Sequence, residues 1–441
     1  MNIADFKNKK VLIMGLGTIG KGLKDALFFY EAGSIVTVTD LKTKEQLQGS
    51  LDILSKYKNI ILHLGEHLES DFIENDIIVR NPDVRYDSPF LEIAKKHNKK
   101  IIMDESYACT QTDAKIIGIT GTRGKTTTTT LVYEILKEAK KDVYISGNIM
   151  GTATLPLLKK LNKDSYLVLE LSSWQLQGFK DEKFSPEFSL ITNIYEDHLN
   201  RGVGMDDYVD DKKNIYKFQN NTGILFLNKD RNDKYHDQFK KEAKGKIVYF
   251  SKNDVIDYKT NLLGDHNLEN IAAARIICLN LGIKEEIIKK IVSKFNPIEF
   301  RLQKIREVNK ISFVNDTTST SPIAGIKALE SFDKKVILIC GGATKYLPLD
   351  EFAEKIVRKA KFVILLSGTE TNNLKKRIEH FGGENLIVGT FDDFEKAIMT
   401  AYKRAERKDV ILLSPGCASF GMFENEYDRG HKFNKIVNDL K

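Results

Sequence analysis

The sequence predicts an α/β protein of three domains, each built around a parallel or mostly parallel sheet. Along the chain, three segments alternate short apolar stretches typical of buried strands with longer helix-like patterns, the signature of α/β layers. A length of 441 residues suits three domains of roughly 150 residues each. The 8 prolines are few and no low-complexity linker or internal repeat occurs, so short loops must join the segments. We expect domains over residues 1–109, 110–297 and 298–441.

Composition is that of an ordinary globular chain, with 41% hydrophobic and 29% charged residues. The net charge of +7 comes from lysines spread along the chain, so an anionic small-molecule substrate explains it and a nucleic-acid partner is not required. The four cysteines lack CxxC spacing, which indicates neither a zinc site nor a disulfide framework. Without a signal-peptide core or a stretch that could cross a bilayer, we expect a cytoplasmic protein with no membrane insertion.

The first segment carries a glycine motif at the end of its first strand. Gly15, Gly17 and Gly20 fit GxGxxG, and Asp40 ends the next strand. This pattern is typical of a Rossmann-like dinucleotide site, so an NAD-dependent dehydrogenase is one hypothesis, and glycines that only tighten a turn are another. We interpret the domain as a holder for the diphosphate of a UDP-sugar, because a dehydrogenase would not explain the second phosphate loop described next. The strands expected here span residues 10–14, 34–39, 60–62, 77–79 and 101–103.

The second segment contains a phosphate loop between a predicted strand, 114–120, and a predicted helix, 127–139. Gly121 and Gly124 let the backbone wrap around phosphate oxygens, and the helix N-terminus adds its dipole. Lys125 can reach the outer phosphates and the Thr126 hydroxyl can hold magnesium. The spacing departs from the standard Walker A loop, because position 119 is isoleucine. We therefore expect a P-loop-type ATP-binding domain with an unusual loop.

Two further strands of this segment end in polar residues. Glu170 closes an apolar strand over 166–171, and Asn193, Asp197 and His198 follow a strand over 188–192. Ligands of parallel sheets sit at the carboxyl ends of strands, so Glu170 would face the phosphate loop and could bind magnesium. Alone, either strand end could simply face water, and a single histidine is more often structural than a ligand; its position at the same edge of the sheet makes the two interpretations about equal. Strands over 223–227 and 246–250 and a helix from residue 267 complete the segment.

The third segment starts near Pro297 and again alternates strands and helices. We expect a second Rossmann-like domain, with strands over 311–314, 336–340, 362–366 and 410–413.

These motifs resemble those of the Mur ligases, the ATP-dependent amide-forming enzymes of peptidoglycan synthesis, and more loosely those of folylpolyglutamate synthases and cyanophycin synthetases. The resemblance rests on the phosphate loop, on Glu-Leu-Ser-Ser at 170–173 and on Asn-x-x-x-Asp-His at 193–198, and it extends over essentially the whole chain. The glycine motif at residues 15–20 and the segments 414–420 and 428–430 are most similar to those of the D-glutamate-adding branch. The alternatives are a relative that uses another amino acid or folate, the dehydrogenase, and a regulatory nucleotide-binding protein without catalysis.

The resemblance implies that D-glutamate is joined to UDP-N-acetylmuramoyl-L-alanine through an acyl phosphate, with ATP and two magnesium ions, by a monomer. It implies magnesium ligands at Thr126, Glu170, His198 and a carbamylated Lys212, with Lys213 as the alternative to Lys212. The expected catalytic residues are Lys125, Glu170, His198 and Lys212. The ATP contacts implied are Gly121, Thr122, Arg123, Gly124, Lys125, Thr126, Thr127, Asn267, Asn270, Arg301 and Asp316. The UDP-substrate contacts implied are Gly15, Gly17, Thr18, Ile19, Asp40, Leu41, Asn81 and Asn148. The D-glutamate contacts implied are Thr320, Lys345, Ser419 and Phe420.

Three positions depart from the family pattern. Arg123 replaces a common asparagine in the phosphate loop, Asp83 replaces a glycine, and Thr317-Thr318 stand where some members have lysine after Asn-Asp-Ser. They bear on the phosphate contacts, the uracil end of the UDP site and the amino-acid pocket, respectively.

Overall fold

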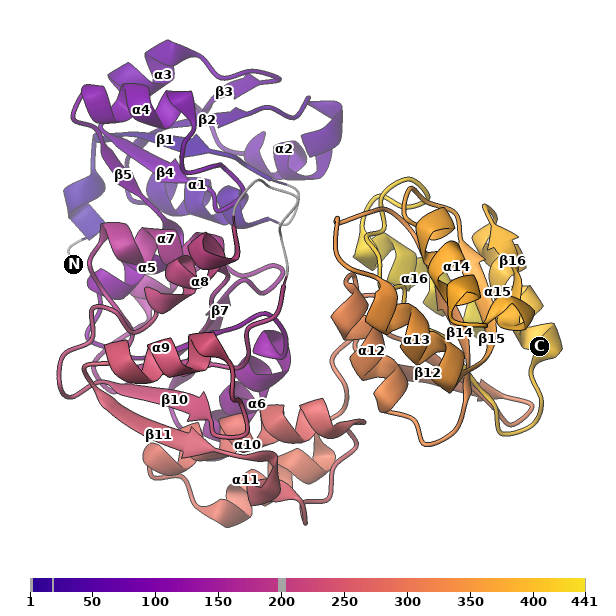
Figure 1. The fold of residues 1–441 in the computed structure, drawn as a ribbon. Coiled ribbons are helices and arrows are strands. Elements are labelled where there is room, and N and C mark those ends of the chain that lie inside the picture. Colours follow the sequence, from indigo (N-terminus) through magenta and orange to yellow (C-terminus); the bar gives the residue numbers. More distant parts are fainter. Residues whose placement is uncertain (1–2, 18–19, 197–203, 441) are drawn as a thin grey trace.

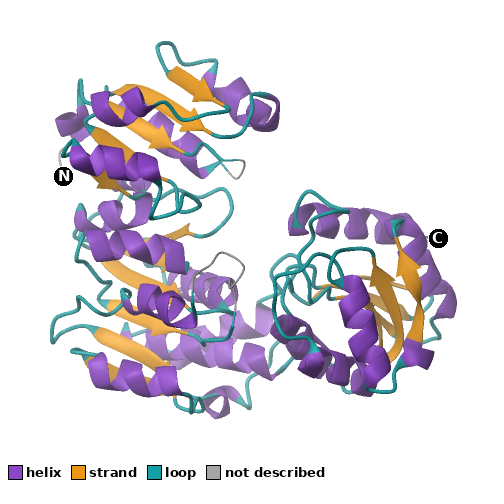
Figure 2. Ribbon diagram, turned by 45° about the horizontal axis from the view of Figure 1, so that its top comes forward, coloured by secondary structure: helices purple, strands orange, loops and turns teal. Residues whose placement is uncertain are grey.

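The computed structural model describes residues 3–17, 20–196 and 204–440, which form three α/β domains (Figure 1). The front domain lies directly against the middle domain, and the C-terminal domain stands beside them (Figure 1). In each domain helices cover a central sheet (Figure 2). The predicted fold class is confirmed. We propose the domain boundaries near residues 110 and 298, in the connections that precede the first strands of the middle and C-terminal sheets.

The front domain has a five-stranded parallel sheet in the order β3-β2-β1-β4-β5. Its order matches that of a Rossmann sheet up to the fifth strand. The strands are β1 (Lys10–Met14), β2 (Ile35–Asp40), β3 (Ile61–Leu64), β4 (Ile77–Arg80) and β5 (Lys100–Ile102). The helices are α1 (Lys21–Glu31), α2 (Gln48–Leu54), α3 (Glu69–Glu74), α4 (Pro89–Lys96) and α5 (Asp104–Thr110).

The middle domain has a six-stranded parallel sheet in the order β11-β10-β9-β6-β8-β7. Its strands are β6 (Lys115–Thr120), β7 (Val143–Gly147), β8 (Tyr166–Glu170), β9 (Phe188–Ile191), β10 (Ile224–Asn228) and β11 (Lys246–Phe250). Its helices are α6 (Lys125–Glu138), α7 (Ser173–Asp181), α8 (Met205–Lys213), α9 (Lys234–Glu242), α10 (Asp265–Asn280) and α11 (Glu285–Lys294), and a short 3-10 helix, η3, spans Leu155–Lys159.

The C-terminal domain has a six-stranded sheet in the order β12-β13-β17-β14-β15-β16, in which only the edge strand β12 is antiparallel to its neighbour. Its strands are β12 (Gln303–Val308), β13 (Ile311–Asn315), β14 (Val336–Cys340), β15 (Ala360–Leu366), β16 (Ile387–Phe391) and β17 (Val410–Leu413). Its helices are α12 (Pro322–Glu330), α13 (Asp350–Lys359), α14 (Thr371–His380), α15 (Phe394–Arg404) and α16 (Glu426–Asp439).

Helices on both faces explain why the central strands read as continuous apolar runs. In β6, Ile117 and Ile119 belong to the hydrophobic core on one face of the sheet, whereas Ile116 belongs to the core on the other face. All three are buried. A strand enclosed in this way is held rigidly, and β6 therefore fixes the start of the phosphate loop that follows it.

Three edge strands, β7, β12 and β16, were not predicted from the sequence. β7 and β16 carry only short apolar runs and are half-buried along most of their length. β12 reads QKIREV and pairs with only one neighbour, β13. The interior strands, which carry the site, were predicted to within a few residues. Within the described ranges, no helix is both long and apolar enough to span a bilayer.

Candidate active site

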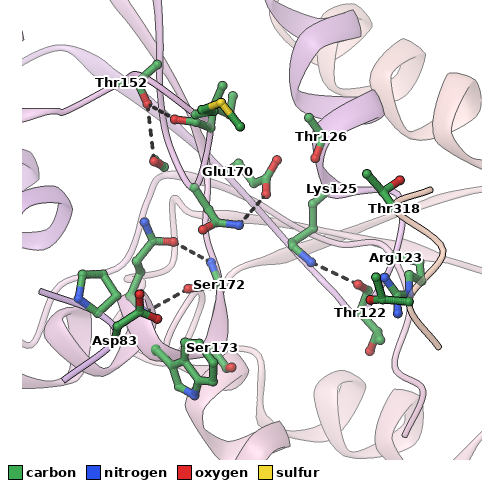
Figure 3. A pocket seen from close by; sticks show the side chains of 18 of the residues that line it. Asp83, Thr122, Arg123, Lys125, Thr126, Thr152, Glu170, Ser172, Ser173 and Thr318 are labelled. Atoms are coloured by element: carbon green, nitrogen blue, oxygen red, sulfur yellow. Dashed lines mark hydrogen bonds between the residues drawn. The ribbon is translucent and has the colours of Figure 1, made fainter. Parts of the chain in front are cut away.

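The carboxyl ends of three adjacent strands, β9, β6 and β8, carry the polar segments that the sequence singles out. β6 runs into the phosphate loop, β8 ends at Glu170, and Asn193 follows β9. Ligands of parallel sheets bind at this edge. A cavity of about 320 Å³ opens there, and Figure 3 shows Lys125, Thr126 and Glu170 around it. Its walls include residues of the front and C-terminal domains, among them Lys21, Asn81, Asp83, Arg301, Thr320 and Lys345.

The phosphate loop requires both of its glycines. Gly121 has φ 140° and Gly124 has φ 84°, in the region that favours glycine. A Cβ on Gly121 would lie 2.0 Å from Thr192 Oγ1, and one on Gly124 would lie 2.2 Å from Asn270 Oδ1. Asn193 anchors the loop, because its backbone carbonyl accepts from the Thr122 N–H (2.9 Å) and its side-chain oxygen accepts from the next N–H (2.8 Å).

Lys125 and Thr126 open helix α6 at the rim of the cavity. The Lys125 ammonium donates to the carbonyls of Gly121 (2.9 Å) and Thr122 (3.0 Å), so it lies over the loop (Figure 3). The Thr126 hydroxyl accepts from the guanidinium of Arg301 at 3.1 Å. This hydrogen bond brings a cation of the C-terminal domain to the phosphate loop.

Glu170 is a buried carboxylate at the end of β8, with 2% of its surface exposed. Its Oε1 accepts from the side-chain amide of Asn148 at 2.9 Å (Figure 3). Its Oε2 is buried and has no hydrogen-bond partner among the described residues. Leaving a buried carboxylate oxygen unpaired is unfavourable, so this atom is suited to a cation that enters the cavity.

Lys212 and Lys213 end helix α8 but point to different surroundings. Lys212 is 1% exposed and lines the cavity, where its ammonium donates to the Gly121 carbonyl at 3.1 Å and lies 4.4 Å from the centre of the Tyr208 ring. Lys213 instead pairs with Asp210 at 3.0 Å and with Glu242 at 3.1 Å. Of the two lysines that the sequence left open, only Lys212 lies in the wall of this cavity.

A second cavity, of about 90 Å³, lies between the middle and C-terminal domains on the far side of the phosphate loop. Asn267, Asn270, Arg301 and Asp316 line it, as do three residues at the loop, Arg123, Gly124 and Thr127. The candidate ATP contacts are thus divided between this cavity and the main one.

Asp316 is held deep in the wall of the second cavity. Its carboxylate accepts hydrogen bonds from the Leu302 N–H (3.1 Å) and the Ser414 hydroxyl (2.9 Å). Burial nevertheless raises the pKa of Asp316 to about 6, because desolvation outweighs these hydrogen bonds.

The candidate D-glutamate contacts are divided by the structure. The Lys345 ammonium donates to the Thr320 hydroxyl at 3.0 Å, and both residues line the main cavity. Ser419 is buried, Phe420 is 64% exposed, and neither lines that cavity in this arrangement of the domains. The structure therefore brings two of the four together at the main cavity.

A third cavity, of about 540 Å³, lies over the front sheet and is lined by five of the predicted UDP-substrate contacts, namely Gly15, Gly17, Asp40, Leu41 and Asn81. Asp40 accepts from the Gly17 N–H at 3.0 Å and from the Lys42 N–H at 2.9 Å, so its carboxylate holds the glycine loop in shape. Asn81 and Asp83 line both this cavity and the main one. The two cavities therefore meet at this loop. Asn148 lies in the main cavity.

Comparison with known proteins decides the family. Residues 9–103 match the model of the Mur ligase MurD-like N-terminal domain, residues 119–258 the Mur ligase middle domain, and residues 300–417 the Mur ligase glutamate ligase domain. The chain is 37% identical to the UDP-N-acetylmuramoylalanine–D-glutamate ligase of Roseiflexus sp. (strain RS-1), over 97% of this chain and 98% of that one. It is 36% identical to the enzyme of the same name from Clostridioides difficile (strain 630), over 99% and 100% of the two chains. This chain belongs to the Mur ligase family.

Solved structures of Mur ligases share the fold. MurC from Thermotoga maritima superposes with a TM-score of 0.63 at 18% identity, over 98% of this chain and 100% of that one. MurF from the same organism, in complex with ADP, superposes with a TM-score of 0.62 at 19% identity, over 99% of both chains. Family membership favours an ATP-dependent ligase and leaves the dehydrogenase hypothesis without support.

Three of the residues that the Mur ligase resemblance implies lie outside the described residues: Thr18, Ile19 and His198. The described part of the chain contains no group of three or more His, Cys, Asp or Glu side chains that could hold a metal. Of the proposed ligands, Thr126, Glu170 and Lys212 all line the main cavity, and Glu170 contributes an oxygen without a hydrogen-bond partner among the described residues. Oxygen donors of this kind suit magnesium.

The structure shows what surrounds the positions that depart from the family pattern. The Arg123 guanidinium donates to the Ser321 hydroxyl, so it reaches across to the C-terminal domain. Asp83 lies where the front and main cavities meet, and Thr318 lines both cavities beside the phosphate loop. Sequence reasoning missed Lys21, a buried lysine in the wall of the main cavity. Its only signal is its position directly after the GxGxxG motif.

Proposed function

We propose that this Mur ligase joins D-glutamate to UDP-N-acetylmuramoyl-L-alanine in peptidoglycan precursor synthesis, using ATP. One observation carries the proposal: a phosphate loop and a buried, half-unpaired Glu170 face one cavity that all three domains line. A cavity lined by all three domains is suited to a reaction in which three reactants meet. Identity of 36–37% to curated D-glutamate ligases over nearly the whole chain supports the choice of amino acid.

We propose that the UDP-sugar binds in the front cavity and extends past Asn81 into the main one. Asp40, bonded to the Gly17 amide, would keep the glycine loop in the shape that receives the diphosphate. Gly15, Leu41, Thr18 and Ile19 complete the proposed contacts on this side. Asn148, at the far end of this path, would approach the muramoyl group. The alanyl carboxylate would then lie near Lys125.

ATP would bind with its base side in the second cavity and its phosphates on the loop. Asn267, Asn270, Arg301 and Asp316 border the base side, and the phosphates would meet Lys125 and the start of helix α6. The loop backbone at Thr122 and Arg123, held by Asn193, would need little rearrangement to receive them.

We propose that Thr126, Glu170, His198 and a carbamylated Lys212 hold two magnesium ions. The carbamate forms when the neutral amine of Lys212 adds to carbon dioxide and releases a proton, which turns a buried cation into an anion. When bound, magnesium neutralises the phosphate charge during phosphoryl transfer. The unpaired oxygen of Glu170 supports this assignment.

The reaction follows from this placement. An oxygen of the alanyl carboxylate attacks the γ-phosphorus, ADP leaves, and an acyl phosphate forms while Lys125 stabilises the transferred charge. Lys345 and Thr320, already paired at the cavity wall, would hold D-glutamate, together with Ser419 and Phe420 once the domains close. The D-glutamate amine attacks the acyl carbon, phosphate leaves with its bonding electron pair, and the proton lost from the nitrogen passes to that phosphate. Closure would exclude water from the acyl phosphate.

The direct test measures phosphate release from ATP with UDP-N-acetylmuramoyl-L-alanine and a panel of amino acids. We expect release with D-glutamate to exceed that with L-lysine or diaminopimelate by at least about 100-fold, since rejecting a substrate that leaves buried polar groups unpaired is efficient. Equal rates across the panel would contradict the proposal. We also propose that the protein acts as a cytoplasmic monomer, which light scattering after size exclusion would check.

A further inference from the structure

We propose that Lys21 and Glu105 form a buried ion pair that positions Gln175 in the wall of the reaction cavity, and that both act as positioning residues for the reaction. Lys21 and Glu105 belong to no motif used above. Their role in catalysis rests on the proposed function, whereas their contacts do not.

The pair spans two helices of the front domain. Lys21 is the first residue of α1, is 6% exposed and lines the main cavity, while Glu105, in α5, is fully buried. The Lys21 ammonium bonds Glu105 Oε1 and lies 3.3 Å from the Asp104 carboxylate. The same Oε1 atom accepts a hydrogen bond from the side-chain amide of Gln175, in α7 of the middle domain. One carboxylate oxygen thus joins the two domains.

Gln175 connects Glu105 to the segment that follows strand β8 of the middle sheet. Its side-chain oxygen accepts from the Ser172 N–H at 2.8 Å, and its own N–H donates to the Ser172 hydroxyl at 3.2 Å, which forms a capping box at the start of α7. Ser172 lies two residues after Glu170, and both it and Gln175 line the cavity. Fixing the Gln175 side chain therefore fixes the chain that leaves Glu170.

Among the contacts of this cluster, Lys21 is the cation that compensates Glu105, whereas Lys21 itself also lies beside Asp104. The Asp104 carboxylate is already satisfied by the Thr154 N–H (3.0 and 2.8 Å to its two oxygens) and the Leu155 N–H (2.6 Å). Glu105 Oε2 is buried and has no hydrogen-bond partner among the described residues, so Glu105 is held through Oε1.

A third carboxyl group nearby, that of Asp25, adds no further compensating charge for Lys21. Burial, and then the proximity of Asp104, raises the pKa of Asp25 well above its usual range, which favours the neutral form. Removing one partner of a buried pair leaves the other uncompensated, whereas removing both together can be neutral for stability. Stability should therefore fall in a single variant and recover in the double variant, whereas a positioning role predicts that the kinetic loss does not recover.

The same joint offers a matched control. Glu31, the last residue of α1, pairs with Lys159 of η3 at 2.5 Å, and the two side chains are 51% and 39% exposed. This pair also crosses from the front to the middle domain, but it contacts neither Gln175 nor the cavity. Exposed pairs contribute little, so Glu31→Gln should alter neither stability nor catalysis.

The test compares Lys21→Met, Glu105→Gln, the double variant and Glu31→Gln. We expect Lys21→Met to lower Tm and to reduce kcat/KM for the UDP-substrate by at least about tenfold, as loss of a supporting contact does in comparable sites. KM for D-glutamate should stay within about twofold, because Thr320 and Lys345 lie in another domain. The double variant should regain Tm but keep the loss in kcat/KM. Glu105→Gln preserves shape and leaves Lys21 beside Asp104, so it should fold and show the same kinetic loss.

Two results would overturn the positioning role. In the first, the double variant regains kcat/KM together with Tm, which a purely structural pair predicts. In the second, Glu105→Gln has wild-type kinetics for the UDP-substrate. Calorimetric titration of each variant with the UDP-substrate in the absence of ATP keeps this test separate from the proposed function. If wild-type protein binds the UDP-substrate but does not use D-glutamate, the proposed function fails, and about tenfold weaker binding by Glu105→Gln still supports the pair.

Discussion

The two joints between the domains differ in where their charges lie. At the joint between the front and middle domains, Lys21, Asp104 and Glu105 are almost completely buried, and α5 packs against α7. Buried charges tolerate little displacement, because each must keep its partner. This joint therefore holds the front cavity in a fixed relation to Glu170.

At the joint between the middle and C-terminal domains, hydrogen bonds cross beside open cavities. They include those from Arg301 to Thr126 and from Arg123 to Ser321. Figure 1 shows the C-terminal domain beside the other two domains. Interfaces of this kind permit relative motion. From this comparison we infer that the proposed UDP-substrate side is preset, whereas the proposed amino-acid side is adjustable.

The largest effect is expected at Lys212, between the two joints. Replacing it by alanine removes the proposed carbamate, and we expect kcat to fall by about 100-fold or more, as for loss of a group that stabilises the transition state. A short carboxylic acid should restore part of the activity, measured as phosphate release. Lys213→Ala is the matched control and should remain active. An inactive Lys213→Ala beside an active Lys212→Ala would move the carbamate by one residue.

The next effect separates the joints directly. Arg301→Ala should raise KM for ATP by about tenfold, because a cation at the phosphate loop is lost, while Tm stays close to that of wild type. Arg407→Ala, at an exposed position of the same domain, serves as the control and should change neither. A large fall in Tm for Arg301→Ala would show that this joint is as fixed as the front one.

A smaller effect concerns the shape of the whole molecule. Small-angle X-ray scattering with a non-hydrolysable ATP analogue and the UDP-substrate should show a decrease in radius of gyration, because the adjustable joint closes. The UDP-substrate alone should leave the curve unchanged. Identical curves in all states would argue against closure.

The smallest effect is a pH dependence of stability at the adjustable joint. Burial raises the pKa of Asp316 to about 6, above its ordinary value of about 4. The folded state thus binds the proton more tightly, so this contribution to stability is complete below about pH 4 and is lost as the pH rises through about 6. Urea unfolding should show a fall on the order of 3 kcal/mol at most over this range, absent in Asp316→Asn. An equal fall in the variant would assign the effect to other groups.

The sequence predicted best those features that depend on residues close together in the chain. The Gly121–Thr127 loop was recognisable because its glycines, lysine and threonine must follow one another for any phosphate to bind. Glu170 was recognisable as the end of an apolar strand. By contrast, β12 has no continuous apolar run and β7 and β16 have only short ones, and the sequence did not reveal these three edge strands.

Long-range pairing was beyond sequence reasoning. Lys21 and Glu105 are separated by 84 positions, and neither position suggests the other. Lys212 had no local signal of its own and was singled out only by family resemblance; its burial at the loop carbonyls appears in the structure. The roles of Ser419 and Phe420 stay predictions, because they depend on how the adjustable joint closes.

The central claim, activation of the alanyl carboxylate by phosphorylation, is tested most directly by oxygen transfer. UDP-N-acetylmuramoyl-L-alanine labelled with ¹⁸O in its carboxylate would be turned over with ATP and D-glutamate, and the released phosphate examined by ³¹P NMR. The mechanism predicts that one labelled oxygen from each turnover appears in inorganic phosphate, because the attacking oxygen leaves with the phosphoryl group. Phosphate free of label, with product formed, would contradict it.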